Sequence, residues 1–259
     1  MLVFNLTHGG ISVITTYHRP TTLSEALALV KKENVYPLGG GIQLSQFSDD
    51  AYEVVDLQAL ALNGIVKKGN ILEIGATATL QALLETSDIP EALKKAIQHE
   101  TSLNTRNAAT VAGTLIASDG RSPFAVMMMG LDADVTITNE AGEKTSKLGD
   151  LLSLREDTLK GKLITKISIP LNMNARYEYV ARTPADKPIV CVAFGQWSGG
   201  RIRLVIGGWG TSPSLAMDGK GAIGIEMAAK NAAHDATDAW ASAEYRQDVA
   251  ATLAKRCLS

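Results

Sequence analysis

Apolar residues near the start of the chain recur first at helical spacing and then in short runs that are typical of strands. The apolar positions of the helix are Leu23, Ala26, Leu27 and Val30. Their spacing predicts a helix, and Thr22 with Glu25 has the spacing of a capping box at its start. Apolar runs at 35–38 and 53–57 predict two strands. We therefore expect a first α/β unit that ends near residue 60.

Alternating hairpin and helix signals predict a second unit from residue 61 to residue 171. Its expected elements are hairpins at 64–75 and 134–146, helices that begin at Thr79 and Pro90, an apolar helix at 123–131 and a strand at 161–170. The apolar helix contains Met127, Met128 and Met129. Core packing is the expected role of such flexible apolar side chains.

The remaining residues, 172–259, predict a third unit in which sheet is followed by helix. Strands at 189–197 and 201–209 are joined by Ser198-Gly199-Gly200, which is a hairpin turn signal. Alanine-rich segments at 221–233 and 243–257 predict helices. The three units together predict an α+β protein.

The most unusual local pattern is Tyr36-Pro37-Leu38-Gly39-Gly40-Gly41-Ile42-Gln43-Leu44, where a predicted strand runs into three glycines. Glycine reaches backbone angles that side chains forbid, and it lets another group approach the main chain closely. Successive free N–H groups in such a turn suit a phosphate. A tight surface turn is the alternative interpretation, because the stretch contains neither a dinucleotide fingerprint nor a Walker loop.

A second stretch of small residues, 105–115, reads Thr-Arg-Asn-Ala-Ala-Thr-Val-Ala-Gly-Thr-Leu and lies between two predicted helices. Backbone N–H donors in two such segments could hold the two ends of one pyrophosphate, because charge-assisted hydrogen bonds are roughly twice as strong as neutral ones. Thr110 and Thr114 add hydroxyl donors, and capping of the next backbone turn is their alternative role.

With these motifs the chain resembles the FAD-binding medium subunit of the molybdenum hydroxylases, a family that includes xanthine dehydrogenase and aerobic carbon monoxide dehydrogenase. The family reads A-G-G-T-D/N-L at the first stretch and I-R-N-x-A-T-I-G-G-N at the second. Residues 39–44 match the first loosely, and residues 105–114 match the second well. Further similar pieces are Tyr17-His18-Arg19-Pro20, residues 74–79, residues 130–133, residues 167–170 and Ser242-Ala243-Glu244-Tyr245-Arg246.

The resemblance covers about residues 15–259 and implies both a fold and a domain order. It implies two α/β FAD-binding subdomains of the p-cresol methylhydroxylase/vanillyl-alcohol oxidase type, at 1–60 and 61–171. Residues 1–14 are expected to be an extension of the first. The resemblance also implies a C-terminal α+β domain of the carbon monoxide dehydrogenase flavoprotein type at 172–259.

The resemblance also implies the cofactor-binding residues, and FAD is the cofactor that it implies. The first segment contributes Leu38, Gly39, Gly40, Gly41, Ile42, Gln43 and Leu44. The second contributes Ala109, Thr110, Val111, Ala112, Gly113 and Thr114. Asp119 takes the place of a family aspartate, with Arg121 as the alternative occupant and a turn cap as the alternative role. Ile164 matches a position whose backbone meets the flavin, and a buried strand residue is the alternative there.

Several residues depart from the family pattern around these segments. Ile42 stands where the family usually has threonine, Gln43 replaces aspartate or asparagine, and Val180 stands near a position that is often lysine. Ala112 replaces a glycine, and a position with positive φ would be strained there. These departures bear on flavin affinity more than on the fold.

The function that the resemblance implies is electron transfer by a flavin without a catalytic acid, base or nucleophile from the protein. Electrons pass from a molybdenum-cofactor large subunit through an iron–sulfur small subunit to FAD, and from FAD to an acceptor such as NAD or a quinone. Two alternatives remain open. One is a stand-alone flavoprotein oxidoreductase, and the other is a relative that has lost FAD and serves as a structural or assembly protein, which Ile42, Ala112 and Val180 motivate.

Composition excludes other classes of protein and metal chemistry. The chain has 259 residues and a formal net charge of −2, so nothing favours binding to nucleic acid or an anionic membrane. We expect no membrane span, because no apolar run approaches roughly 20 residues. Two cysteines and four histidines without ligand spacing predict no metal site. We find no targeting segment, and the cytoplasm is the expected location.

Overall fold

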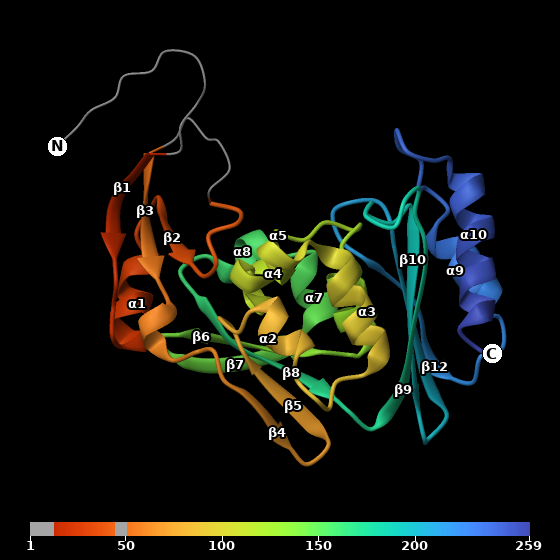
Figure 1. Ribbon diagram of the computed structural model, residues 1–259, viewed down its shortest axis with the longest axis horizontal. Helices are drawn as coiled ribbons and strands as arrows, with labels where there is room; N and C mark the ends of the chain where they lie inside the picture. The colour runs from red at the N-terminus through yellow and green to blue at the C-terminus, as the bar shows by residue number, and fades with distance from the viewer. Residues whose placement is uncertain (1–12, 45–50) are drawn as a thin grey trace.

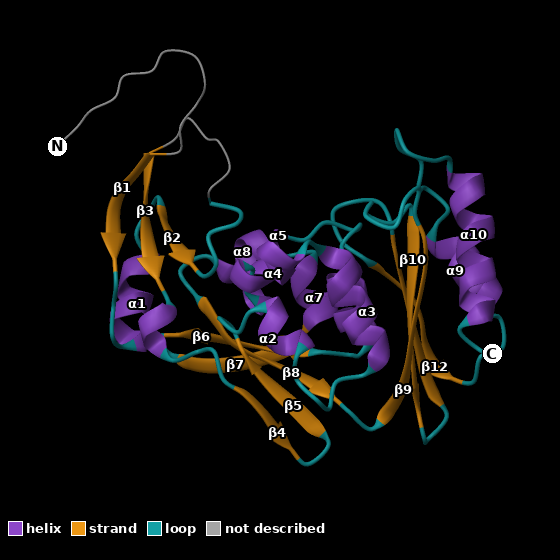
Figure 2. Cartoon of the chain, viewed as in Figure 1, coloured by secondary structure: helices purple, strands orange, loops and turns teal. Residues whose placement is uncertain are grey.

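This computed structural model describes residues 13–44 and 51–259, which form three sheets flanked by helices (Figure 1). Most helices of the middle part lie over one face of the middle sheet, and two further helices cover the outer face of the third sheet (Figure 2). The mixed architecture confirms the α+β fold class. Within the described residues, no helix has the length and apolar character that crossing a membrane requires.

The first sheet has the order β1-β3-β2, and its strands are β1 (Val13–His18), β2 (Val35–Leu38) and β3 (Ala51–Asp56). All neighbours in it are parallel. Because parallel neighbours need a crossover connection, helix α1 (Leu23–Val30) joins β1 to β2 and packs on the sheet. The extension expected for residues 1–14 stays a prediction, and β1 begins at residue 13. The rest of it, 1–12, lies outside the described residues.

Helix α1 begins as its sequence predicts. The Thr22 hydroxyl accepts a hydrogen bond from the backbone N–H of Glu25. The Glu25 carboxylate returns to the N–H of Thr21 at 3.1 Å, one residue earlier than in the standard capping box. Both side chains therefore satisfy backbone donors that the helix leaves free.

The second sheet is antiparallel throughout and has the order β4-β5-β8-β6-β7. Its strands are β4 (Ile65–Lys68), β5 (Ile71–Gly75), β6 (Asp134–Asn139), β7 (Gly142–Lys147) and β8 (Leu163–Pro170). The short helix η1 (Gln58–Leu60) precedes β4 in the chain. The helices between the strands are α2 (Leu80–Leu84), α3 (Glu91–Glu100), α4 (Leu103–Ala108), α5 (Val111–Ala117), α6 (Pro123–Gly130), α7 (Leu148–Leu152) and α8 (Arg155–Leu159). All eight residues of α6 are buried, as expected for a helix that is apolar on every side.

The third sheet is an antiparallel meander with the order β12-β11-β10-β9. Its strands are β9 (Met173–Val180), β10 (Val190–Trp197), β11 (Arg201–Gly207) and β12 (Ser214–Lys220), and α9 (Ile225–Ala232) and α10 (Ala243–Arg256) follow. Helices α3 and α6 pack on one face, and α9 and α10 cover the other. Because both faces are covered, β10 is a continuous buried run, which is why its sequence is apolar without alternation.

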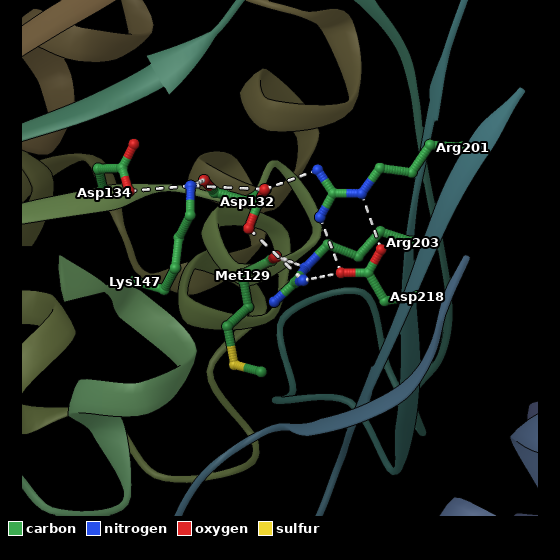
Figure 3. Close-up of polar contacts among 7 residues, drawn as sticks. All are labelled: Met129, Asp132, Asp134, Lys147, Arg201, Arg203 and Asp218. Carbon is green, nitrogen blue, oxygen red and sulfur yellow. Dashed lines mark hydrogen bonds and ion pairs between the residues drawn. The ribbon is translucent and has the colours of Figure 1, made fainter. Parts of the chain in front are cut away.

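A polar network joins the end of α6 to the third sheet (Figure 3). Arg201 donates to Asp132 at 2.9 Å and to Asp218 with two hydrogen bonds of 2.8 Å. The buried Arg203 guanidinium donates to the carbonyl of Met129 at 2.9 Å and to Asp218. The hydrogen bond from Arg201 lowers the pKa of the Asp218 carboxyl below its usual value, and the charge of Arg203 adds to this. The network therefore fixes β11 and β12 against the middle unit.

Candidate functional site

The glycine segment that follows β2 lies directly against the junction between α4 and α5. A Cβ atom on Gly40 would lie 1.8 Å from the carbonyl oxygen of Ala108, and one on Gly39 would lie 2.7 Å from the Thr110 hydroxyl oxygen. Gly41 has φ of +73°, a conformation that residues with side chains rarely adopt. Gly39 and Gly40 are therefore needed because the second segment lies so close to them, and Gly41 is needed for its backbone conformation. The two predicted segments lie side by side at these glycines.

The two segments line one cavity of about 260 Å³. The predicted residues that line it are Gly39, Gly40, Gly41, Ile42, Gln43, Leu44, Ala109, Thr110, Gly113 and Thr114. Ligand pockets usually measure roughly 300–1,000 Å³. The cavity therefore has room for one part of a dinucleotide, such as its diphosphate, rather than for the whole molecule.

Backbone donors are available at the wall where the segments meet. Among the described residues, no group accepts a hydrogen bond from the amide N–H of Gly40, Gly41 or Thr110. An unpaired amide donor in a concave wall suits an anion, because a charged acceptor strengthens the hydrogen bond. The Thr110 hydroxyl oxygen accepts from the N–H of Gly113 at 3.2 Å, so its own hydrogen is free to donate.

The second segment contributes fewer amides than the sequence predicts. The N–H of Val111 donates to Ala78 at 2.8 Å, and the N–H of Ala112 donates to Ala76 at 3.1 Å. These bonds attach the segment to the chain between β5 and α2. The amides of Val111 and Ala112 therefore already have protein acceptors, and the binding role of these two residues stays a prediction.

The remaining amides of the second segment belong to the first turn of a helix. The N–H of Thr114 donates to the carbonyl of Thr110 at 2.8 Å, and Thr110 is the N-cap of α5. The sequence suggests a glycine loop here. The structure has instead a junction between α4 and α5, in which only residues 109 and 110 lie outside a helix. Thr110 thus has the capping role that was its alternative, and its hydroxyl also lines the cavity.

Ala112 introduces no backbone strain. Among the described residues, the only non-glycine positions with positive φ are Asn34, Ala61 and Asp132. Ala112 lies in the first turn of α5, where alanine is favoured over glycine. The strain expected at this position is therefore absent.

Five predicted residues do not line the cavity. Leu38 ends β2 and its carbonyl accepts from Leu57. Ile164 is a buried residue of β8, as its alternative interpretation held. Val111 is completely buried and Ala112 packs on the core. The fifth, Asp119, is half exposed, and its carboxylate accepts from the N–H of Arg121 at 2.9 Å, which is a turn cap.

Arg121, the alternative occupant of the acidic position, does not line the cavity either. Its guanidinium lies over the Trp240 ring at 4.6 Å and donates to the carbonyl of Lys187 at 3.3 Å. It therefore holds the loop after β9 in place.

Five residues that line the cavity were not among the predicted cofactor-binding residues. These are Pro37, Glu100, Thr101, Thr105 and Lys187. Pro37 and Thr105 lie within the two small-residue stretches, and Glu100 and Thr101 shortly precede the second, so their positions in the sequence pointed to the cavity. Lys187 lies more than 70 residues further along the chain, and no local pattern around it points to the cavity.

The cavity lies where a glycine turn meets the start of helix α5. Residues 11–172 match the family described as the FAD binding domain in molybdopterin dehydrogenase. The match covers more than half of the chain, and the chain belongs to this family. It is an FAD-binding medium subunit of the molybdenum hydroxylase type, a class of oxidoreductases.

Two relatives of known sequence are named as medium chains of dehydrogenases. The chain is 27% identical over 223 residues to the glyceraldehyde dehydrogenase medium chain of Sulfolobus acidocaldarius, with 78% of each chain covered. It is 30% identical over 169 residues to the carbon monoxide dehydrogenase medium chain of Afipia carboxidovorans, which covers 60% of this chain and 58% of the relative.

Solved structures share the fold over almost the whole chain. One is the reconstituted CO dehydrogenase from Oligotropha carboxidovorans, with a TM-score of 0.80 at 22% identity, covering 96% of this chain and 97% of that one. Another is quinoline 2-oxidoreductase from Pseudomonas putida 86, with a TM-score of 0.77 at 22% identity and 96% of each chain covered. The fold class implied by the sequence resemblance is confirmed.

Proposed function

We propose that this chain is an electron-transfer subunit that holds the diphosphate of FAD in the cavity between its two small-residue segments. The observation that carries the proposal is the set of unpaired amide donors at Gly40, Gly41 and Thr110 around one cavity. Bound FAD supplies the redox chemistry, taking up electrons from iron–sulfur clusters and passing them to an acceptor such as NAD or a quinone.

The protein's own residues bind and orient the cofactor in this proposal. The amides of Gly40 and Gly41 donate to phosphate oxygens, and the Thr110 hydroxyl adds a side-chain donor. Leu38, Val111, Ala112, Asp119 and Ile164 remain proposed cofactor-binding residues. No side chain is needed as an acid, base or nucleophile, because the reaction takes place on the cofactor.

We further propose that the partners are an iron–sulfur small subunit and a molybdenum-cofactor large subunit. Two relatives are named as medium chains of dehydrogenases, a term that fits an assembly with smaller and larger chains. This chain has two cysteines, Cys191 and Cys257, both buried. An iron–sulfur cluster usually needs four thiolates, so the clusters would lie on another chain.

Purification of the tagged chain from its native cells tests the proposal. We expect bound FAD in the released chromophore, together with co-purified chains that contain iron and molybdenum. A yellow protein without iron or molybdenum would instead support a stand-alone flavoprotein. A protein that stays colourless after saturation with FAD would contradict the proposed function.

A further inference from the structure

Lys187 is a cavity residue from a different part of the fold than the others. It lies in the loop between β9 and β10 of the third sheet, whereas every other lining residue falls between Pro37 and Thr114. The third sheet therefore contributes one side chain to the cavity, and this side chain carries a positive charge.

The backbone around Lys187 is held in place by contacts from two other segments. The carbonyl of Lys187 accepts from Arg121 at 3.3 Å. The neighbouring carbonyl of Asp186 lies 2.9 Å from a ring nitrogen of His99 on α3, and the Asp186 carboxylate accepts from the N–H of Thr183 at 3.1 Å. The loop is thus attached to α3 and to the segment between α5 and α6, which fixes where the lysine side chain starts.

The Lys187 ammonium group forms ion pairs but no hydrogen bond within the described part of the chain. Its ion pairs are long, at 3.7 Å to Glu100 and 4.0 Å to Asp119. No hydrogen bond from its Nζ to another described residue is formed, and 42% of the side chain is exposed. An ammonium group has three N–H donors. A ligand anion could therefore take them without breaking a protein hydrogen bond.

Glu100 explains why a cation is needed at this place. Its side chain is only 8% exposed, and the residue lines the cavity. One oxygen, Oε2, accepts from the Ser122 hydroxyl at 2.7 Å and from the N–H of Phe124 at 3.0 Å, at the start of α6. The other oxygen, Oε1, faces Lys187. Without the ammonium group, this negative charge would repel a diphosphate in the same cavity.

We propose that Lys187 is a binding residue for the FAD diphosphate, which it meets with its ammonium group while it neutralises Glu100. This inference rests on the proposed function. In addition, the third unit takes part in holding the cofactor. The affinity for FAD should fall as the salt concentration rises, because salt screens the charge of Lys187. FAD binding thus depends on the position in which the loop after β9 holds Lys187 at the cavity.

Titration of the full-length, cofactor-free protein with FAD tests the proposal, with Lys187→Gln as the main variant. Lys187→Arg keeps the charge, and Lys220→Gln removes an exposed lysine of the same sheet that does not line the cavity. We expect roughly tenfold weaker FAD binding for Lys187→Gln, since hydrogen bonds to charged groups are worth about 1.5–3 kcal/mol. Lys187→Arg should recover most of the affinity, and Lys220→Gln should bind as the wild type does.

A second measurement locates the contact. Inorganic pyrophosphate should compete with FAD, and its inhibition constant should also rise roughly tenfold in Lys187→Gln, with an unchanged melting temperature. Salt should weaken FAD binding less in this variant than in the wild type. Equal FAD affinity in Lys187→Gln and wild type overturns the inference, as does weaker FAD binding with unchanged pyrophosphate binding. A wild-type chain that binds no FAD overturns the proposed function itself.

Discussion

Gly40 is the residue at which the two cavity segments come closest. Its missing side chain leaves room for the carbonyl of Ala108, which a Cβ atom would approach to 1.8 Å. Real Cβ atoms do not tolerate a backbone oxygen at that distance, so any larger residue must push the segments apart. Gly40 and Gly41 would then lie further from Thr110 across the cavity.

Replacement of Gly40 by alanine tests this closeness. We expect Gly40→Ala to lose about 1–3 kcal/mol of stability through overpacking and to weaken FAD binding, measured by thermal unfolding and FAD titration. Gly64→Ala is the matched control, because a Cβ there has nothing within 4 Å. If Gly40→Ala bound FAD as tightly as the wild type, the segments would not form the binding wall together.

At the residue scale, the sequence revealed the glycines but not what surrounds them. Three glycines and a Thr-rich stretch are visible locally, and the resemblance placed them in one site. The partners of the Val111 and Ala112 amides are Ala78 and Ala76, ordinary residues that no motif marks. Lys187 reaches the cavity through tertiary folding alone. Hydrogen-bond partners of this kind depend on the packed structure, so a local pattern cannot predict them.

At the scale of elements, strands without a clear alternation of buried and exposed positions were the hardest to predict. Strand β1 is exposed along most of its described length, and β12 is a sheet edge with mixed burial. Neither shows a clear alternation of apolar residues. Strand β10 and helix α6 were predicted nearly at their true bounds, because both are covered on all sides and read as continuous apolar runs.

The network between α6 and β12 provides a prediction at this scale. In the folded protein the pKa of Asp218 is lowered, first by the hydrogen bond from Arg201. The unfolded state therefore binds more protons at low pH, and the contribution of Asp218 is present above the unfolded pKa of about 3.9. It is lost as the pH falls through the lower, folded pKa.

We expect Asp218→Asn to lower the unfolding free energy by about 0.5–1.5 kcal/mol at pH 7, because solvent screens this partly exposed carboxylate. The difference from the wild type should shrink below about pH 4. Urea unfolding between pH 3 and 8 measures both, with the pH range chosen around that value. Asp235→Asn is the control, because its side chain is 95% exposed and a surface pair adds little. If the difference in unfolding free energy between Asp218→Asn and the wild type did not change with pH, the charge of Asp218 would not be what stabilises the fold.

At the scale of the whole molecule, the third sheet lies between two layers of helices and shares a core with the middle unit. Cys191, Ala193 and Val205 of this sheet belong to the same apolar cluster as α6. Each sheet falls within one of the units 1–60, 61–171 and 172–259, which remain a proposed division. The shared core indicates that the third unit is attached firmly enough to position Lys187.

Arg246 of α10 fixes the outer layer of this sheet. The side chain is completely buried and donates to the carbonyl of Ile189 at 3.2 Å and to Asp238 at 2.9 Å. We expect Arg246→Met to lower stability by about 3–5 kcal/mol, because Asp238 loses its partner and buried carbonyls lose their donors. Arg256→Met, an exposed change on the same helix, should cost less than about 1 kcal/mol. Similar melting temperatures for the two variants would contradict this role.

The central claim is that one small cavity, walled by two segments that meet at Gly40, binds the diphosphate of FAD. Titration of the cofactor-free chain with FAD, with and without inorganic pyrophosphate, tests it most directly. The account predicts saturable binding of one FAD per chain and a competitive loss of affinity as pyrophosphate is added. Absence of FAD binding, or FAD binding that pyrophosphate leaves unchanged, would contradict it.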